Sequence, residues 1–319
     1  MSIEPIRIIF AGTPEFAVPS LKTLLEDDNF RVSAIITQPD KKRGRKQILT
    51  SPPVKQVAEK HSIPVYQPDN INNISNELKE YQPDILVVVA YAQKIPSEIL
   101  NIPRYGCFNV HSSLLPQYRG AAAIQAPILH GDKESGVTII KMNEGLDTGD
   151  ILKQEEITLS PTETYPSLHE KLAELGANVL PFSLLGYIKG EMELSPQNED
   201  QATYVSSCKK QDGHLDWRES AEIIERKIRA FQPWPGTYSC VKHSGNKKIM
   251  IKVLEVEHQP LKINDYPSGT LFMDDKENLC IQCQNNALKI IKIQPEGKSS
   301  MNGKEFIRGY KDLLGKPLE

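Results

Sequence analysis

The chain has 319 residues, of which 39% are hydrophobic and 25% charged, and its formal net charge at pH 7 is −3. This composition is typical of a soluble globular protein, and the length favours two domains over one. Residues 1–10 lack a basic head followed by a long apolar run. We therefore expect neither a signal peptide nor a membrane span, and a cytoplasmic location.

The charge is distributed unevenly along the chain. Residues 1–206 contain 19 Lys and Arg against 26 Asp and Glu, a net charge of −7, whereas residues 207–319 contain 19 against 15, a net charge of +4. Positive charge in the C-terminal third fits contact with a polyanion, although many solvated surfaces carry a similar excess.

The first residues predict a β-α-β unit. An apolar strand, Ile6–Gly12, is followed by Thr13 and Pro14, which fit the N-cap and first position of a helix. A second strand follows at Val32–Thr37. Such alternation predicts an α/β fold with a Rossmann-like, mostly parallel sheet. Because Gly12–Ala17 does not complete the G-x-G-x-x-G pattern, we do not expect a dinucleotide site.

A strongly basic segment comes next. Five basic side chains occupy six positions around a glycine, namely Lys41, Lys42, Arg43, Arg45 and Lys46. Such a run by itself is typical of a solvated surface loop. The arginines are suited to bidentate phosphate or base contacts, and the lysines add less directional charge.

Further alternation continues the sheet. Helical patterns at 54–61 and 74–81 are interleaved with strands at 65–67, 85–90 and 107–111. The strand at 85–90 is apolar throughout, so we expect it at the centre of the sheet, with its carboxyl end beside that of 107–111. Ligands gather at such strand ends in open α/β sheets. Residues 136–140 and 151–159 then predict a strand pair, and a long helix begins at 162–164.

Two polar side chains stand at the end of the apolar strand 107–111. Asn109 and His111 are two residues apart, so a strand turns both to the same side. An Asn amide can hold a developing oxyanion, a His can exchange a proton near neutral pH, and the Asp147 carboxylate can orient the imidazole. This set suits acyl transfer without a covalent enzyme intermediate. The alternatives are a merely structural His at a strand end, and Asp150 as the carboxylate.

Four motifs carry a resemblance to a known family: Asn109-Val110-His111, Ser113-Leu114-Leu115-Pro116, Tyr118-Arg119-Gly120-Ala121-Ala122 and Gly145-Leu146-Asp147-Thr148-Gly149-Asp150. Together they resemble the core of the formyltransferases that use 10-formyltetrahydrofolate, and within that family the branch that acts on initiator methionyl-tRNA. The resemblance covers nearly the whole chain. It implies formyl transfer to the α-amino group of methionine on the initiator tRNA, with Asn109, His111 and Asp147 as catalytic residues and no metal.

The resemblance also implies where the substrates bind. The formyl donor is expected at the turn of Ser113, Leu114, Leu115 and Pro116 and at Tyr91. Ala92, Lys94 and Ala123 depart from the residues more common in the family at their positions. The basic segment at 41–46 looks like an insertion that grips the tRNA acceptor arm in this family. Further contacts to the tRNA backbone are expected from Arg226, Lys227, Arg229, Lys247 and Lys248.

We expect a catalytic domain at 1–189, a linker at 190–206 and a smaller tRNA-binding domain at 207–319. A helix at 220–231 precedes short strands at 248–257, 269–273, 279–284 and 287–293, and a final helix lies near 303–314. Short strands separated by turns predict a small β-barrel, and the resemblance makes it OB-like.

The five cysteines lie at positions 107, 208, 240, 280 and 283. The last two have the C-x-x-C spacing of redox and zinc sites, but strand alternation turns them to opposite faces, so we expect ordinary reduced thiols.

Two other functions share part of these features. A formyltransferase for glycinamide ribonucleotide or an amino sugar nucleotide would need the same triad without the basic segment. A noncatalytic RNA-binding protein on this scaffold would keep the charges and tolerate loss of the triad. Since triad and basic segment occur together, we favour the tRNA-formylating enzyme, and we expect a monomer.

Overall fold

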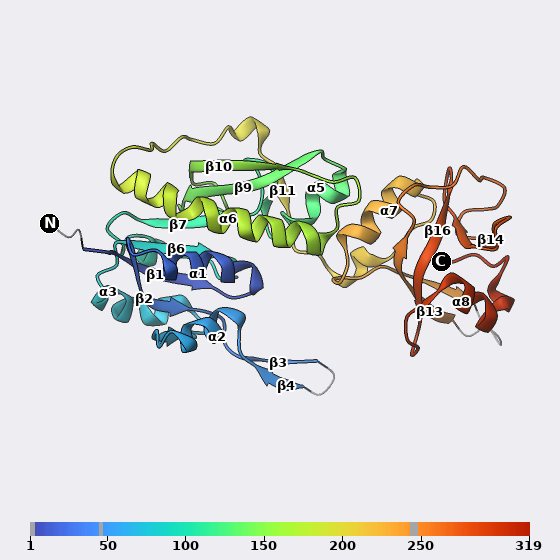
Figure 1. The fold of residues 1–319 in the computed structure, drawn as a ribbon, viewed down its shortest axis with the longest axis horizontal. Helices are drawn as coiled ribbons and strands as arrows, with labels where there is room; N and C mark the ends of the chain where they lie inside the picture. The colour runs from blue at the N-terminus through green and yellow to red at the C-terminus, as the bar shows by residue number, and fades with distance from the viewer. Residues whose placement is uncertain (1–3, 45–46, 243–247) are drawn as a thin grey trace. The chain divides into compact units, whose positions relative to one another are not determined.

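The computed structural model describes residues 4–44, 47–242 and 248–319, and the chain forms two compact units. Unit 1 consists of Met1–Ala123, Glu134–Thr158 and His169–Val205, and unit 2 of Ile124–Lys133, Leu159–Leu168 and Ser206–Glu319. Each unit has its own sheet (Figure 1). Two short segments from the middle of the chain therefore fold with the C-terminal residues.

The sheet of unit 1 has seven strands in the order β10-β9-β7-β6-β1-β2-β5. Their bounds are β1 (Ile6–Gly12), β2 (Phe30–Ile36), β5 (Val65–Tyr66), β6 (Ile85–Val89), β7 (Cys107–His111), β9 (Glu134–Lys141) and β10 (Asp150–Thr158). Strands β5, β2, β1, β6 and β7 are parallel, and β9 and β10 add an antiparallel edge. The predicted mostly parallel α/β sheet is confirmed, with the apolar strand β6 fully buried.

Helical segments accompany these strands. They are η1 (Glu15–Ala17), α1 (Val18–Glu26), α2 (Pro53–Lys60), η2 (Ile71–Ile74), α3 (Ser75–Glu80), α4 (Ser97–Leu100) and α6 (Tyr165–Ile188). The predicted cap at Thr13 is wrong. Its hydroxyl instead donates to the Tyr91 carbonyl and accepts from the Gln38 amide, each at 3.3 Å, and so ties together the segments that follow β1, β2 and β6.

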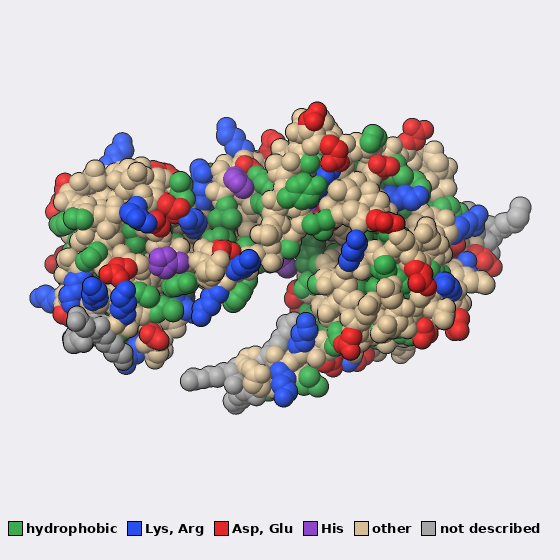
Figure 2. Space-filling view, turned by 180° about the vertical axis from the view of Figure 1, so that it is seen from behind, with side chains coloured by type: hydrophobic (Ala, Val, Ile, Leu, Met, Phe, Trp, Pro, Cys, Tyr) green, Lys and Arg blue, Asp and Glu red, His purple; other side chains and the backbone are tan. Residues whose placement is uncertain are grey.

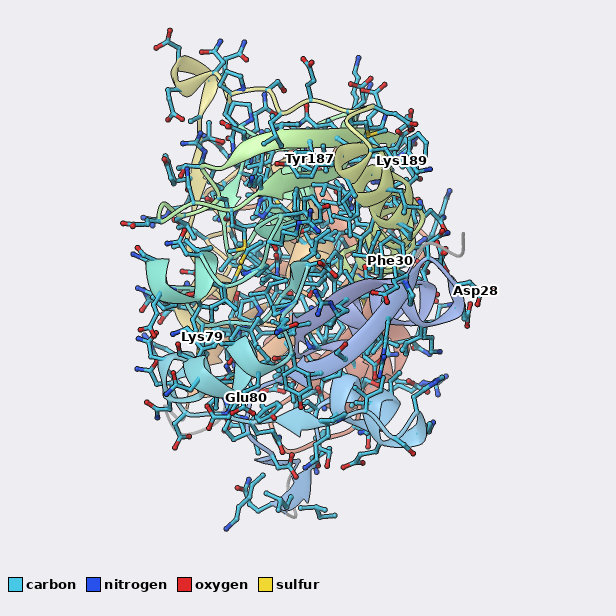
Figure 3. The ribbon with its side chains drawn as sticks, turned by 90° about the vertical axis from the view of Figure 1, so that its left-hand side faces the viewer. Asp28, Phe30, Lys79, Glu80, Tyr187 and Lys189 are labelled. Carbon is cyan, nitrogen blue, oxygen red and sulfur yellow. The ribbon has the colours of Figure 1, made fainter. Side chains whose placement is uncertain are left out.

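Helix α6 covers the face of β7 that carries Phe108 and Val110. Gly176 permits a close approach, since an added Cβ would lie 2.7 Å from Val110 Cγ1. Tyr187 lies near the end of the helix (Figure 3). Its ring packs edge-on against Phe108 at 5.2 Å, and its hydroxyl accepts a 2.9 Å hydrogen bond from Lys141 Nζ. Because side chains alternate along a strand, Asn109 and His111 are left on the opposite face of β7.

The basic segment forms a hairpin where we predicted a loop. Strands β3 (Lys41–Arg43) and β4 (Ile48–Thr50) pair in antiparallel register on either side of Gly44, which has φ +70°. Lys41 and Lys42 are exposed on this projecting hairpin, where Figure 2 shows basic side chains in blue. Ile48 and Leu49 are 61% and 64% exposed, so the hairpin presents apolar as well as basic side chains.

Unit 2 contains an antiparallel sheet in the order β12-β13-β16-β15-β14, with β17 beside β16. Its strands are β12 (Tyr238–Lys242), β13 (Lys248–Val256), β14 (Leu271–Met273), β15 (Leu279–Gln282), β16 (Ala287–Pro295) and β17 (Met301–Asn302). Its helical segments are α5 (Gln125–His130), η4 (Lys210–Gly213), α7 (Ala221–Ala230), α8 (Gly303–Gly309) and η6 (Lys311–Leu313). The predicted smaller β domain is confirmed, although β12 was not predicted.

The C-terminal residues join the two edges of this sheet. On the β12 side, Glu319 and Cys240 exchange backbone hydrogen bonds of 2.7 and 2.8 Å. On the β14 side, Leu318 donates to Gly269 at 2.9 Å and Gly315 to Leu271 at 2.7 Å. The tail thus satisfies edge groups that would otherwise be open to pairing with another chain, and it closes the sheet on itself.

Cys280 and Cys283 are free and buried, and their burial raises the pKa of each thiol to about 12. Over the described ranges, no group of three or more His, Cys, Asp or Glu side chains is arranged to hold a metal ion. Within the same residues, none of the helices is both long and apolar enough to cross a membrane.

The closing role of the tail can be tested at Leu318, which is only 5% exposed in the core of unit 2. We expect Leu318→Ala to lower the free energy of unfolding by about 2–4 kcal/mol, because it leaves a cavity where the tail closes the sheet. Glu319→Gln is the matched control, since that side chain is half-exposed and its ion pairs contribute little. Equal urea midpoints for the two variants would contradict this role.

Candidate active site

Asn109 and His111 lie near the carboxyl end of β7, 9% and 6% exposed. Local structure explains their placement, because Phe108 and Val110 turn toward α6 and leave these two side chains together on the other face. The side chain of Asn109 makes a single hydrogen bond among the described residues, from Nδ2 to Asp147 Oδ1 at 3.5 Å. Its amide therefore keeps N–H capacity for a ligand.

Asp147 reaches this pair from the loop between β9 and β10. Its backbone has φ +55°, a left-handed conformation that a non-glycine residue rarely adopts. Oδ2 accepts a 2.8 Å hydrogen bond from the Gly120 amide and lies 3.6 Å from His111 Nδ1. Asp150 is exposed and begins β10 opposite Lys141, so Asp147 is the carboxylate that meets the polar pair.

The other ring nitrogen of His111 is also engaged. Nε2 lies 3.0 Å from the carbonyl oxygen of Tyr118. A carbonyl can only accept, so Nε2 carries the proton, and in the neutral ring Nδ1 is the lone-pair nitrogen facing Asp147. When the ring gains a second proton, Nδ1–H donates to Asp147 Oδ2. The site thus combines an amide donor, a proton acceptor and a fixed carboxylate.

The turn after β7 is held from several directions. The Ser113 hydroxyl donates to the Gln117 carbonyl at 2.6 Å, the Leu115 amide donates to the Thr138 hydroxyl at 3.1 Å, and the Gln154 amide donates to the Leu115 carbonyl at 2.7 Å. Ser113 and Leu115 are buried, whereas the side chains at Leu114 and Pro116 are partly exposed. Of the four predicted turn residues, Leu114 and Pro116 therefore have side-chain surface free for a ligand.

Tyr91, which we expect at the donor site, has a buried side chain. It is 1% exposed and packs in the apolar cluster with Ile95 and Ile99, and its hydroxyl has no hydrogen-bond partner in the described part of the chain. Desolvation raises the pKa of this hydroxyl to about 12. The neighbouring Ala92 and Lys94 are exposed.

The predicted tRNA-binding residues fall into three groups. Lys41 and Lys42 are exposed on the hairpin, and Lys248 is half-exposed with its Nζ 2.5 Å from Glu319 Oε2. Arg45, Lys46 and Lys247 lie outside the described residues, and of Arg43 only the backbone, in β3, is described. The residues of α7 form the third group and have partners within unit 2.

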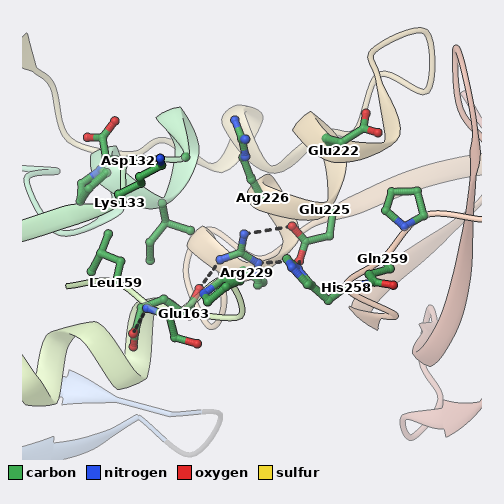
Figure 4. A pocket seen from close by; sticks show the side chains of 16 residues that line it. Asp132, Lys133, Leu159, Glu163, Glu222, Glu225, Arg226, Arg229, His258 and Gln259 are labelled. Atoms are coloured by element: carbon green, nitrogen blue, oxygen red, sulfur yellow. Dashed lines mark hydrogen bonds and ion pairs between the residues drawn. The ribbon is translucent and has the colours of Figure 1, made fainter.

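Figure 4 shows two of these α7 residues, Arg226 and Arg229, beside a pocket of about 380 Å³. Arg226 donates to the His130 carbonyl at 3.1 Å, at the carboxyl end of α5, where a cation is favourable. Arg229 bonds both Glu225 oxygens, at 2.5 and 3.0 Å, and the Glu163 carbonyl. Lys227 pairs with Glu219. All three therefore have structural partners.

Sequence reasoning missed two groups that hold Asp147. One is the backbone amide of Gly120, which no side-chain pattern can reveal. The other is Gln197, whose Nε2 donates to the carbonyls of Asp147 and Gly149 at 2.8 and 2.7 Å. Gln197 belongs to the segment predicted as a linker, where polar composition is the only local signal.

Comparisons with known proteins find two matching family models and many similar chains. Residues 6–184 match the model of the formyl transferase family, and residues 207–311 that of the formyl transferase C-terminal domain. A methionyl-tRNA formyltransferase of Caldanaerobacter subterraneus subsp. tengcongensis is 42% identical over 308 residues, 96% of this chain and 97% of the relative. That of Marinobacter nauticus is 41% identical over 311 residues, 97% and 98% of the two chains.

Solved structures share the fold at lower identity. HypX from Aquifex aeolicus in complex with tetrahydrofolic acid has a TM-score of 0.63 and 17% identity, covering 96% of this chain and 47% of that chain. WlaRD, a sugar 3N-formyl transferase, has a TM-score of 0.60 and 21% identity, covering 92% and 99%.

The pairing of Arg229 with Glu225 gives a stability test of α7. Glu225 is 3% exposed, so Arg229→Met leaves a buried carboxylate with only His258, 3.1 Å from its Oε1. We expect a loss of about 3 kcal/mol in the free energy of unfolding. The double variant Arg229→Met/Glu225→Met should recover most of it, because no unpaired charge remains. A single variant as stable as the parent protein in urea would refute the structural role.

Proposed function

This chain belongs to the methionyl-tRNA formyltransferase family, and we propose that Asn109, His111 and Asp147 are its catalytic residues. The enzyme transfers the formyl group of 10-formyltetrahydrofolate to the α-amino group of methionine esterified to the initiator tRNA. The product is N-formylmethionyl-tRNA for translation initiation. The residue assignment rests on the meeting of these three side chains at the end of β7. Asp147 Oδ1 lies 3.5 Å from Asn109 Nδ2, and Asp147 Oδ2 lies 3.6 Å from His111 Nδ1.

The residues at this site suit the formyl donor. When bound, 10-formyltetrahydrofolate supplies a formyl carbon that an amine can attack. Asn109 retains N–H capacity for the formyl oxygen, and the partly exposed apolar side chains of Leu114 and Pro116 offer surface to an aromatic ring. We therefore propose that the turn at 113–116 holds the donor, with Ser113 and Leu115 shaping it from inside. Tyr91 supports the adjoining strand end through its carbonyl, which accepts from Thr13 and Gln38.

Each catalytic side chain has a separate task. Asn109 Nδ2 donates to the formyl oxygen as negative charge develops on it. His111 Nδ1 accepts the proton that the attacking amine loses, and the resulting imidazolium adds positive charge beside the oxyanion. When the bond between the formyl carbon and N10 of the donor breaks, this proton passes to N10 and tetrahydrofolate leaves. Asp147 Oδ2 accepts Nδ1–H and stabilises the charged ring. The Tyr118 carbonyl keeps the other nitrogen protonated, so the ring has one orientation for this exchange.

Contacts to tRNA are assigned to exposed cations first. We propose that Lys41, Lys42 and Arg43 of the hairpin contact the acceptor arm, together with Arg45 and Lys46, the next basic residues in the sequence. Lys247 and Lys248 are proposed to contact the tRNA backbone from the second domain. Arg226, Lys227 and Arg229 form part of that surface while also holding α7 in place.

The remaining proposals concern organisation. We assign catalysis to residues 1–189, the connection to 190–206 and tRNA binding to 207–319. Since one chain supplies the whole catalytic set, we propose that the enzyme acts as a monomer, and we place it in the cytoplasm, where charged tRNA is used.

Labelled formyl transfer tests the function and the triad together. We expect label on methionine-charged initiator tRNA, and little on charged elongator tRNA, free methionine or glycinamide ribonucleotide. Asn109→Ala should lower kcat by about 10²–10³ through loss of an oxyanion donor, whereas Asn73→Ala, at an exposed position on η2, should not. Label on a small amine would overturn the tRNA assignment. A near-normal kcat in Asn109→Ala would contradict the role of Asn109 as an oxyanion donor.

The hairpin contacts predict a change in salt dependence. Replacing Lys41 and Lys42 by Gln removes two exposed charges, so the slope of log affinity for charged tRNA against log salt should become shallower by roughly 1–2. The matched control is Lys22→Gln/Lys60→Gln, which removes two exposed lysines elsewhere on unit 1. Filter-binding titrations at several salt concentrations measure both slopes, and equal slopes would remove the hairpin lysines from the interface.

A further inference from the structure

The loop that carries Asp147 must be held in place from outside. Its tip is exposed, with Leu146 62% exposed, and Asp147 itself has an unfavourable positive φ. Within the loop, Asn143 Oδ1 accepts from the Gly145 amide and the Thr148 hydroxyl at 3.0 and 2.7 Å. These bonds shape the turn but do not attach it to the strand end where Asn109 and His111 lie.

Gln197 attaches the main chain of this loop. Both hydrogens of its Nε2 are used, one on the Asp147 carbonyl at 2.8 Å and one on the Gly149 carbonyl at 2.7 Å. The amide thereby links the carbonyls of the two residues on either side of Thr148. A hydrogen bond to the main chain of Asp147 restrains the backbone angle from which the carboxylate projects.

Arg119 decides which way this amide faces. Gln197 Oε1 accepts from Arg119 Nε at 3.1 Å and from Nη2 at 2.8 Å. Because a guanidinium has no acceptor, the oxygen of the amide must face Arg119 and the nitrogen must face the loop. A flipped amide would set its oxygen against two carbonyls and its N–H groups against the guanidinium.

Arg119 has no donor left for a ligand. It is fully buried, and its remaining N–H groups bond Glu199 at 2.9 and 2.7 Å and the Tyr204 hydroxyl at 2.7 Å. It stands on the short strand β8 (Arg119–Gly120), which pairs with β11 (Tyr204–Val205). The next residue, Gly120, donates its amide to the Asp147 carboxylate. One two-residue strand therefore holds Asp147 by its side chain directly and by its main chain through Gln197.

We propose that Gln197 is a positioning residue for the Asp147 carboxylate and that Arg119 sets the orientation of its amide. This inference rests on the proposed function, in which Asp147 stabilises the protonated ring of His111. Gln197 touches neither reacting group, so its effect is on the placement of Asp147. A displacement on the order of 1 Å can cost about 10²-fold in rate.

The test is a double-mutant cycle measured on the full-length enzyme by single-turnover transfer of labelled formyl to methionine-charged initiator tRNA. We expect Gln197→Ala to lower the transfer rate by roughly 10- to 100-fold with little change in KM for either substrate. In an Asp147→Asn background the same replacement should change the rate by less than about 2-fold, because the carboxylate it positions is gone. Glu193→Gln, an exposed position in the same segment, should leave the rate unchanged.

A second variant separates positioning from folding. Gln197→Glu keeps an acceptor for Arg119 but sets its second oxygen against the two loop carbonyls, so it should lose at least as much rate as Gln197→Ala. A urea titration of each variant checks that both are folded under the assay conditions. Full rate in Gln197→Glu and Gln197→Ala would overturn the proposal, and so would losses that are equal in both backgrounds. If Asp147→Asn alone transfers formyl at the parent rate, the catalytic role of Asp147 fails instead, and the proposal falls with it.

Discussion

The hydrogen bond from the Gly120 amide to Asp147 Oδ2, 2.8 Å long, brings a carboxylate from an exposed loop to the end of a buried strand. Gly120 is suited to this contact in two ways. Its φ of +110° lies outside the usual range of other residues, and an added Cβ would overlap the carbonyl oxygen of Val205 on β11. A glycine at this position allows β8 to pair with β11 and to present its amide to the loop.

Polar groups around Asp147 differ in how much of their hydrogen-bonding capacity is used. The buried guanidinium of Arg119 has every donor occupied, and both ends of the Gln197 amide are used, so these groups fix structure. The Asn109 side chain makes one long hydrogen bond, to Asp147 Oδ1. His111 Nδ1 lies 3.6 Å from Asp147 Oδ2. Hydrogen bonds in ligand-free catalytic sites are often long and shorten when the substrate binds. The unused hydrogen-bonding capacity therefore lies on Asn109 and His111, the residues proposed to act on the substrates.

Basic side chains in the C-terminal third of the chain stabilise the fold as well as offering a surface for binding. The net charge of +4 in residues 207–319 fits a surface for a polyanion. Arg226 and Arg229, however, are held by the end of α5 and by Glu225, and the pocket they line is part of unit 2. Exposed lysines on the β3–β4 hairpin have no such partners among the described residues, which makes them the better candidates for phosphate contacts.

The sequence by itself determined the elements whose signals are local. Apolar runs placed β1, β6 and β7, and alternation along β7 put Asn109 and His111 on one face, because these signals depend only on neighbouring residues. The motifs around Asp147 pointed to the family because each motif is a short run of neighbouring residues. Only the tertiary structure showed that Gly120 and Gln197 hold Asp147, that Thr13 bridges strand ends, and that residues 315–319 close the β domain. These contacts join residues from 25 to 79 positions apart, as with Thr13 and Gln38 or Cys240 and Glu319. Local periodicity carries no information at that range, since the hydrogen-bond partner is chosen by the fold.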